Sequence, residues 1–215
     1  FGFKATRARF PDGPAAGEGW AGMAIDGFLS RSVRDNATMM DACAGSDLGA
    51  PYAAPPMEMS YSAAIARPPR RLRVGFCDTT FTGEAIHSDC RTAVEDTAQL
   101  LESLGHSVTP FCPKADHDAM MRAWTRIVAC GTALSVQEKL LREGRALRAD
   151  DLQGVSRGAI DYAKSFSGAD YIKAVNTVHA FGRQMAAGFA DIDILLSATL
   201  AEPPAEVGRF THERT

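Results

Sequence analysis

The first clear helical pattern lies in RSVRDNATMMDACAG, residues 31–45. Ser32 can cap a helix here, and Asp35 stands three residues later, where the acidic member of a capping box belongs. Four apolar residues then recur at helical spacing and share one face: Val33, Ala37, Met40 and Ala44. Gly45 is a residue type that often ends a helix. The pattern predicts an amphipathic helix that starts at Ser32.

A strand, a helix and a second strand follow one another between residues 71 and 112. Apolar side chains alternate in RLRVGFC, and HSVTPFC is also β-forming. The segment between them, HSDCRTAVEDTAQLLESLG, predicts a helix that Ser88 caps and Gly105 ends. Its predicted buried face holds Val94, Leu101 and Leu104. Such a unit places its two strands side by side and parallel in one sheet.

Three more helical segments and one short apolar strand are predicted in the rest of the chain. Residues 115–143 have apolar side chains at helical spacing, namely Met121, Trp124, Val128 and Leu141. GVSRGAIDYAKSF predicts a short helix, and the long helix after it has Ser167 as cap and Asp170 three residues on. DILLS, at 193–197, predicts a short buried strand. The class is α/β, with a mixed, mostly parallel sheet surrounded by helices.

Two segments lack a long regular element. Glycines punctuate residues 1–30, which predicts loops and short strands. Prolines interrupt residues 48–69, which therefore predict a connector, either a domain linker or a long surface crossing within one domain. We favour the surface crossing.

Composition restricts the partners. The net charge is −3 and the basic residues are scattered, so nucleic acid and anionic membranes are not expected as partners. No apolar run reaches the roughly 20 residues of a membrane span. The five cysteines are odd in number and irregularly spaced: Cys43, Cys77, Cys90, Cys112 and Cys130. This usage favours free thiols in a reducing cytoplasm over a disulfide framework.

Motifs for chemistry are sparse. Neither GxxxxGK[ST] nor GxGxxG occurs, and the histidines and cysteines lack zinc-like spacing, so we expect no cofactor and no metal. His179 lies beside Val178 on a predicted helix and is expected to be a core or boundary residue, not a base. Cys130 has no adjacent cation and no helix N-terminus to activate it. A hydrolase that uses Cys130 with a histidine is kept only as an alternative.

Three motifs follow one another along the chain: FGFKATRARF, DGFLSRSVRDNATMMDACAG and LLSATLAEPPAEVG. Together they closely resemble the amidase signature family, serine hydrolases that cleave amide bonds. The first resembles the family's Phe-Gly-Phe-Lys-Pro-Thr-Arg-Gly-Arg, with Ala5 and Ala8 as departures. In the second, Phe28 replaces a Pro, and the matching positions are Gly27, Arg31, Ser32, Val33 and Asp35. The third resembles Asp-x-Leu-Leu-Thr-Pro-Thr and matches at Asp193, Leu195, Leu196 and Thr199, with Ser197 and Ala198 as departures.

The resemblance also implies what the chain lacks. In the family the Ser nucleophile, a bridging Ser in a cis peptide, the Lys base and the oxyanion donors all precede the Phe-Gly-Phe-Lys motif, which here begins at Phe1. The family also continues beyond AEPPAEVG. Residues 1–215 are therefore expected to be a partial amidase domain, an internal fragment without a catalytic residue of its own and inactive alone.

The resemblance implies a small-molecule amide as substrate and leaves a homo-oligomer open. The chain is most similar to members that act on amides of aliphatic amino acids, cyclic nylon-oligomer hydrolases among them. The apolar stretch AWTRIVACGTALS and the loop after Leu196 are expected to form pocket wall, with Trp124 and Cys130 as substrate-binding residues. Plain core packing is an equal alternative for that stretch. A non-catalytic α/β binding or scaffolding domain derived from an amidase is the alternative function.

Overall fold

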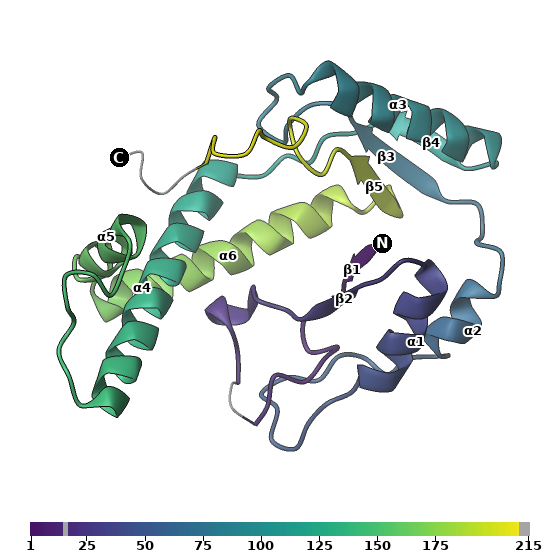
Figure 1. Cartoon of the computed structure of the whole chain (residues 1–215). Coiled ribbons are helices and arrows are strands. Elements are labelled where there is room, and N and C mark those ends of the chain that lie inside the picture. The colour runs from purple at the N-terminus through teal and green to yellow at the C-terminus, as the bar shows by residue number, and fades with distance from the viewer. Residues whose placement is uncertain (15–16, 211–215) are drawn as a thin grey trace. The chain divides into compact units, whose positions relative to one another are not determined.

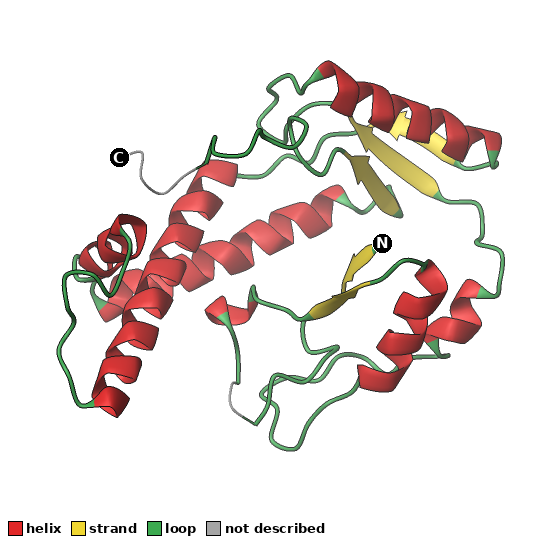
Figure 2. Ribbon diagram, viewed as in Figure 1, coloured by secondary structure: helices red, strands yellow, loops and turns green. Residues whose placement is uncertain are grey.

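The computed structural model of the chain describes residues 1–14 and 17–210 (Figures 1 and 2). The chain divides into two compact units, Phe1–Pro69 and Arg70–Thr215. The boundary falls at the end of the proline-rich connector. Each unit has its own elements and is described by itself.

The first unit combines a two-stranded ribbon with a helix. Strand β1 (Gly2–Lys4) pairs antiparallel with β2 (Gly27–Leu29), and a 3-10 turn, η1 (Trp20–Gly22), lies between them in sequence. Helix α1 (Val33–Cys43) follows, and the Ser32 side chain caps it as predicted. The unit's core consists of Ala5, Phe10 and Met40, with Phe28, Ala44 and Tyr61 packed against it. Val33 is exposed, so its predicted place on the buried face is wrong.

The connector contains a short helix that the sequence pattern did not predict. Helix α2 (Tyr61–Ile65) is capped by Ser60 and contacts α1. The Asp41 carboxylate of α1 accepts hydrogen bonds from the backbone N–H groups of Tyr61 at 2.6 Å and Ser62 at 2.9 Å. Hydrogen bonding at Ser62 lowers the pKa of Asp41. A carboxylate at a helix N-terminus satisfies orphan donors, which explains a helix too short to stand alone.

The second unit is built on a parallel sheet of three strands in the order β4–β3–β5. Strand β3 (Arg73–Cys77) and β4 (Ser107–Pro110) flank helix α3 (Ser88–Ser103), which confirms the predicted strand–helix–strand unit. Strand β5 (Ile194–Ser197) joins the other side of β3, with Gly75 opposite Leu195. Val74 is fully buried in the central strand. The α/β class is confirmed.

Helix α3 departs from prediction at its N-cap and at one residue of its predicted buried face. Its N-cap is His87, whose Nδ1 accepts a hydrogen bond from the backbone N–H of Asp89 at 3.2 Å, so Ser88 is not the cap. Gly105 ends the helix region with a positive φ of 90°, as expected of glycine. Val94 is buried, but Leu104 is 65% exposed and does not belong to the buried face.

Three helices complete the second unit: α4 (His117–Glu143), α5 (Gly154–Ala163) and α6 (Gly168–Gly188). Helix α4 packs against both others (Figure 1). Ser167 and Asp170 form the predicted capping box of α6. The packed face of α4 holds Ala123, Ile127 and Ala129.

Several side chains on these helices are more exposed than their spacing predicted. Met121 and Leu141 are 56% and 81% exposed, so neither belongs to a buried face of α4. His179 on α6 is also exposed, which corrects its expected core or boundary place. Among the described residues, no helix combines the length and apolar character needed to cross a bilayer.

Candidate functional site

An apolar groove runs between α4 and α5, with a volume of about 480 Å³. Helix α4 contributes Cys130, Leu134 and Gln137 to its lining, and α5 contributes Ile160 and Ala163. The groove exists because small side chains alternate with larger ones along α4. Alanine and cysteine leave space that leucine at the same position would fill. Such a lining suits an aliphatic ligand.

Few polar groups reach this groove. They are the Cys130 thiol, the Gln137 amide and the Lys164 ammonium group. Lys164 forms an ion pair with Asp161 at 2.8 Å at the exposed end of α5. A mostly apolar lining with a few polar groups can hold a hydrocarbon chain and orient one polar bond along it.

The Cys130 thiol is protonated at neutral pH. It is half-buried, and burial raises its pKa above the ordinary value because the low-dielectric surroundings disfavour the thiolate. Only the thiolate is a good nucleophile. Cys130 is therefore suited to line a ligand site as a small, weakly polar side chain, and poorly suited to attack a carbonyl group.

The structure separates the two predicted substrate-binding residues. Cys130 lines the groove, whereas Trp124, which precedes it on α4, is not among the described residues that do so. Trp124 is partly buried. The groove thus involves Cys130 and the following turns of α4, not the whole apolar stretch.

A second hollow, of about 200 Å³, lies where β3 and β5 end. Thr79, Thr80 and Phe81 line it after β3, and residues 197–201 line it after β5. Ligands of open parallel sheets bind at the carboxyl ends of the strands. The loop after Leu196 was expected to be pocket wall. The contribution of Thr79 and Thr80 was missed, although hydroxyl side chains directly after an apolar strand were a usable signal.

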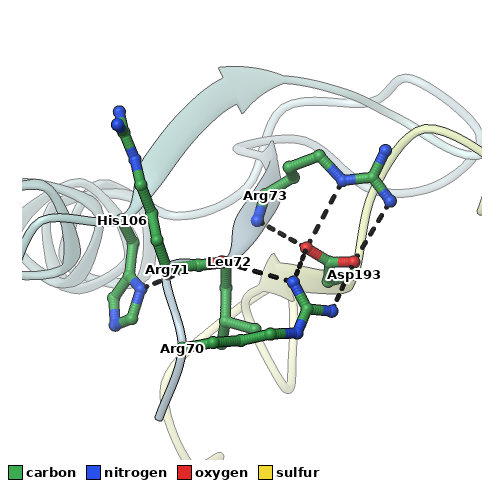
Figure 3. A network of polar contacts seen from close by, with 6 residues as sticks. All are labelled: Arg70, Arg71, Leu72, Arg73, His106 and Asp193. Carbon is green, nitrogen blue, oxygen red and sulfur yellow. Dashed lines mark hydrogen bonds and ion pairs between the residues drawn. The ribbon is translucent and has the colours of Figure 1, made fainter.

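The opposite, amino-terminal ends of these strands carry a network that ties β3 to β5 (Figure 3). The Asp193 carboxylate accepts hydrogen bonds from Arg70 Nη2 at 2.9 Å, Arg73 Nη2 at 3.1 Å and the Arg73 backbone N–H at 2.8 Å. Arg71 points away from this carboxylate, and His106 Nδ1 accepts from the Leu72 N–H at 3.2 Å. Because it lies at the amino ends of the strands, we interpret this network as structural.

The hydrogen bonds from Arg70 and then Arg73 hold the pKa of Asp193 far below its ordinary value of 3.8. The carboxylate is thus charged at any physiological pH. Its partners are mostly exposed, with side-chain accessibilities of 69% and 54% for Arg70 and Arg73. Exposed ion pairs of this kind contribute little to the free energy of unfolding. Their main effect here is to fix the register of β5 against β3.

Histidine and acidic side chains do not form a metal site in the part of the chain that the structure describes. No three His, Cys, Asp or Glu residues within 1–14 and 17–210 gather closely enough to hold an ion. The His117 ring lies between two aromatic rings, with centroid distances of 5.7 Å to Phe81 and 5.3 Å to Phe181. The groove and the hollow are two places where this chain can meet a small organic ligand.

Comparison with known proteins places this geometry in a family. The amidase family profile matches residues 1–215. The chain is 28% identical over 214 residues to a 6-aminohexanoate-cyclic-dimer hydrolase from Paenarthrobacter ureafaciens, covering 97% of this chain and 43% of that protein. It is 24% identical over 211 residues to a putative amidase from Synechocystis, covering 98% of this chain and 38% of that protein. The chain thus spans less than half the length of these relatives.

Solved structures agree with this assignment. A 6-aminohexanoate cyclic dimer hydrolase complexed with substrate superposes with a TM-score of 0.90 at 28% identity, over 96% of this chain and 44% of that one. A bacterial aryl acylamidase of the amidase signature family has the same fold, with a TM-score of 0.78 at 22% identity, over 93% of this chain and 41% of that one. The family match spans all 215 residues of the chain, which therefore belongs to the amidase family.

Proposed function

We propose that these 215 residues supply the substrate-side wall of an enzyme that hydrolyses a carboxylic amide C–N bond. The observation that carries the proposal is the apolar groove at Cys130, set in a chain that matches the amidase family throughout. The superposition on a hydrolase of a cyclic aliphatic amide supports it. An aliphatic acyl chain fits the groove chemically, because its lining offers mainly methyl and methylene groups.

The proposed reaction passes through an acyl-enzyme, with a Ser nucleophile, a bridging Ser and a Lys base. None of the 215 residues matches those family positions, so the proposal assigns them to other parts of the enzyme. A Ser hydroxyl needs an adjacent base to become a nucleophile. A Lys can be that base when burial or a neighbouring cation lowers its pKa. Backbone donors then stabilise the tetrahedral oxyanion by about 3–4 kcal/mol each.

Within this proposal, Cys130 contacts the substrate and Trp124 stays a prediction from sequence. The neutral Cys130 thiol adds little polarity to the groove and leaves room for a methylene chain. The hollow after β5, with the hydroxyl groups of Ser197 and Thr199, is a separate and more polar site.

The test is a chimera. Residues 1–215 replace the matching stretch of the Paenarthrobacter hydrolase, and release of 6-aminohexanoate products from the cyclic dimer is measured. The purified 215-residue chain serves as control and is expected to be inactive. We expect the chimera, but not the purified 215-residue chain, to turn over the cyclic dimer. A folded chimera without turnover on the cyclic dimer and on a panel of N-acyl anilides would contradict the proposal, as would turnover by the control chain.

A further inference from the structure

Two thiols flank a single hydroxyl group at the carboxyl ends of β3 and β4. The Cys77 Sγ lies 3.7 Å from Thr79 Oγ1, and the Cys112 Sγ lies 3.8 Å from the same atom. The Cys77 thiol also donates to the Thr79 carbonyl at 3.5 Å, and the Cys112 thiol donates to the Thr80 carbonyl at 3.7 Å. Neither thiol has a role in the function proposed above.

The strand pairing brings the two cysteines within reach of each other. Phe76 is paired with Pro110 in parallel register, and the Phe111 N–H still donates to the Phe76 carbonyl at 2.8 Å. Cys77 follows Phe76 and Cys112 follows Phe111, so the two cysteines stand one residue out of direct register. Neighbouring strands lie about 4.8 Å apart and a strand rises about 3.3 Å per residue, so such a diagonal pair spans roughly 6 Å. That distance falls within the roughly 4.4–6.8 Å of Cα separation that a disulfide spans.

The two thiols differ in accessibility, which gives them different chemical roles. Cys77 is only 2% exposed, whereas Cys112 is partly exposed. A small disulfide oxidant can therefore reach Cys112 first and form a mixed disulfide with it. Cys77 is then placed to attack the Cys112 sulfur. Exposed Cys43, by contrast, offers a thiol outside this pair.

We propose that Cys77 and Cys112 form a reversible disulfide when a small disulfide oxidant reaches Cys112. The Cys112 thiolate attacks one sulfur of the oxidant, which forms a mixed disulfide and releases one thiolate. The Cys77 thiolate then attacks the Cys112 sulfur and releases the second thiolate. Two protons leave the protein thiols and protonate the two released thiolates. Both cysteines are oxidised, and the oxidant is reduced to two thiols.

The bond changes the hollow between the ends of β3 and β5. The Thr79 hydroxyl contacts both sulfurs, so closing the disulfide changes its contacts, and Thr79 and Thr80 are lining residues of the hollow. Burial, and next the Cys77 thiol, raise the pKa of Cys112. Reaction at neutral pH is therefore slower than at an ordinary exposed thiol.

The test uses the full chain incubated with oxidised glutathione, then alkylated and digested with trypsin. Cys77 and Cys90 fall in one tryptic peptide, residues 74–91, and Cys112 falls in residues 92–114. The experiment is therefore run on wild type and on Cys90→Ser. We expect the two peptides linked, with the mass of two hydrogens lost, in both proteins. Dithiothreitol should reverse the link, and Cys43 should carry glutathione only.

Two variants make the outcome decisive. Cys112→Ala should abolish the link, and Cys77→Ala should leave Cys112 as a stable mixed disulfide with glutathione. Far-UV circular dichroism establishes that each variant is folded, and Cys77→Ser replaces Cys77→Ala if the latter is not. The proposal is overturned if wild type shows no link once Cys43 is fully modified, or if Cys90→Ser removes the link.

Discussion

Asp193 and Arg73 bind each other through main chain and side chain, although 120 residues separate them in sequence. The Asp193 N–H donates to the Arg73 carbonyl at 2.8 Å, and the Arg73 N–H donates to Asp193 Oδ2 at 2.8 Å. Arg70 adds a second guanidinium group to the same carboxylate. This relationship sets the register of β5 against β3, and so fixes where the loop after Leu196 begins.

We expect Asp193→Asn to lower the melting temperature by a few degrees at pH 7. The pKa of Asp193 is lower in the folded chain than its ordinary value of 3.8, so its charge stabilises the fold above that pH. That contribution is lost as the pH falls below 3.8 toward the folded pKa. Thermal melts from neutral to acidic pH should show the gap between variant and wild type narrowing. A gap that widens on acidification would contradict this role, and exposed Asp150→Asn is the control.

The buried and exposed faces of α4 should respond differently to truncation. Ile127 is 1% exposed and Leu141 is 81% exposed on the same helix. We expect Ile127→Ala to cost about 2–5 kcal/mol of unfolding free energy, because it leaves a cavity. Leu141→Ala should change it by about 0.5 kcal/mol or less. Urea unfolding measures both, and equal losses would show that the face assignment is wrong.

The start of α3 offers a test between two adjacent residues. His87 caps the helix in the structure, whereas the sequence pattern pointed to Ser88. We expect His87→Ala to destabilise the chain by about 0.5–1 kcal/mol, because the Asp89 N–H loses its acceptor. Ser88→Ala should cost less than about 0.5 kcal/mol. Urea unfolding measures both losses. A larger loss for Ser88→Ala than for His87→Ala would show that Ser88 is the N-cap.

Local signals predicted the elements that depend on local chemistry. The Ser167–Asp170 capping box, the Ser32 cap and the β3–α3–β4 unit are confirmed because caps and crossovers involve residues close in sequence. Helix α2 was missed because its stabilising carboxylate, Asp41, lies 20 residues away. Spacing shows which residues share a helix face, but not which face another element covers. Leu104 and Leu141 therefore proved exposed.

Local sequence likewise indicates only part of the proposed site. Small residues beside Cys130 indicated open space, and the groove lies there. Nothing in the local sequence indicates that α5 forms the opposite wall of the groove. Nor does it indicate that β5 pairs with β3, about 120 residues away, and so brings their carboxyl ends together at the hollow. Trp124 was grouped with Cys130 because both lie in one apolar stretch, but only Cys130 lines the groove.

The central claim is that the groove at Cys130 receives the acyl chain of an amide. The most direct measurement compares kcat/KM of Cys130→Leu and wild-type chimeras across N-acyl anilides of increasing chain length, with exposed Cys43→Leu as the matched control. Leucine fills the groove, so we predict about a tenfold loss for the longest chains relative to the shortest, with the melting temperature unchanged. An equal loss of rate on every substrate, with a lowered melting temperature, would show Cys130 to be a core residue and contradict the claim.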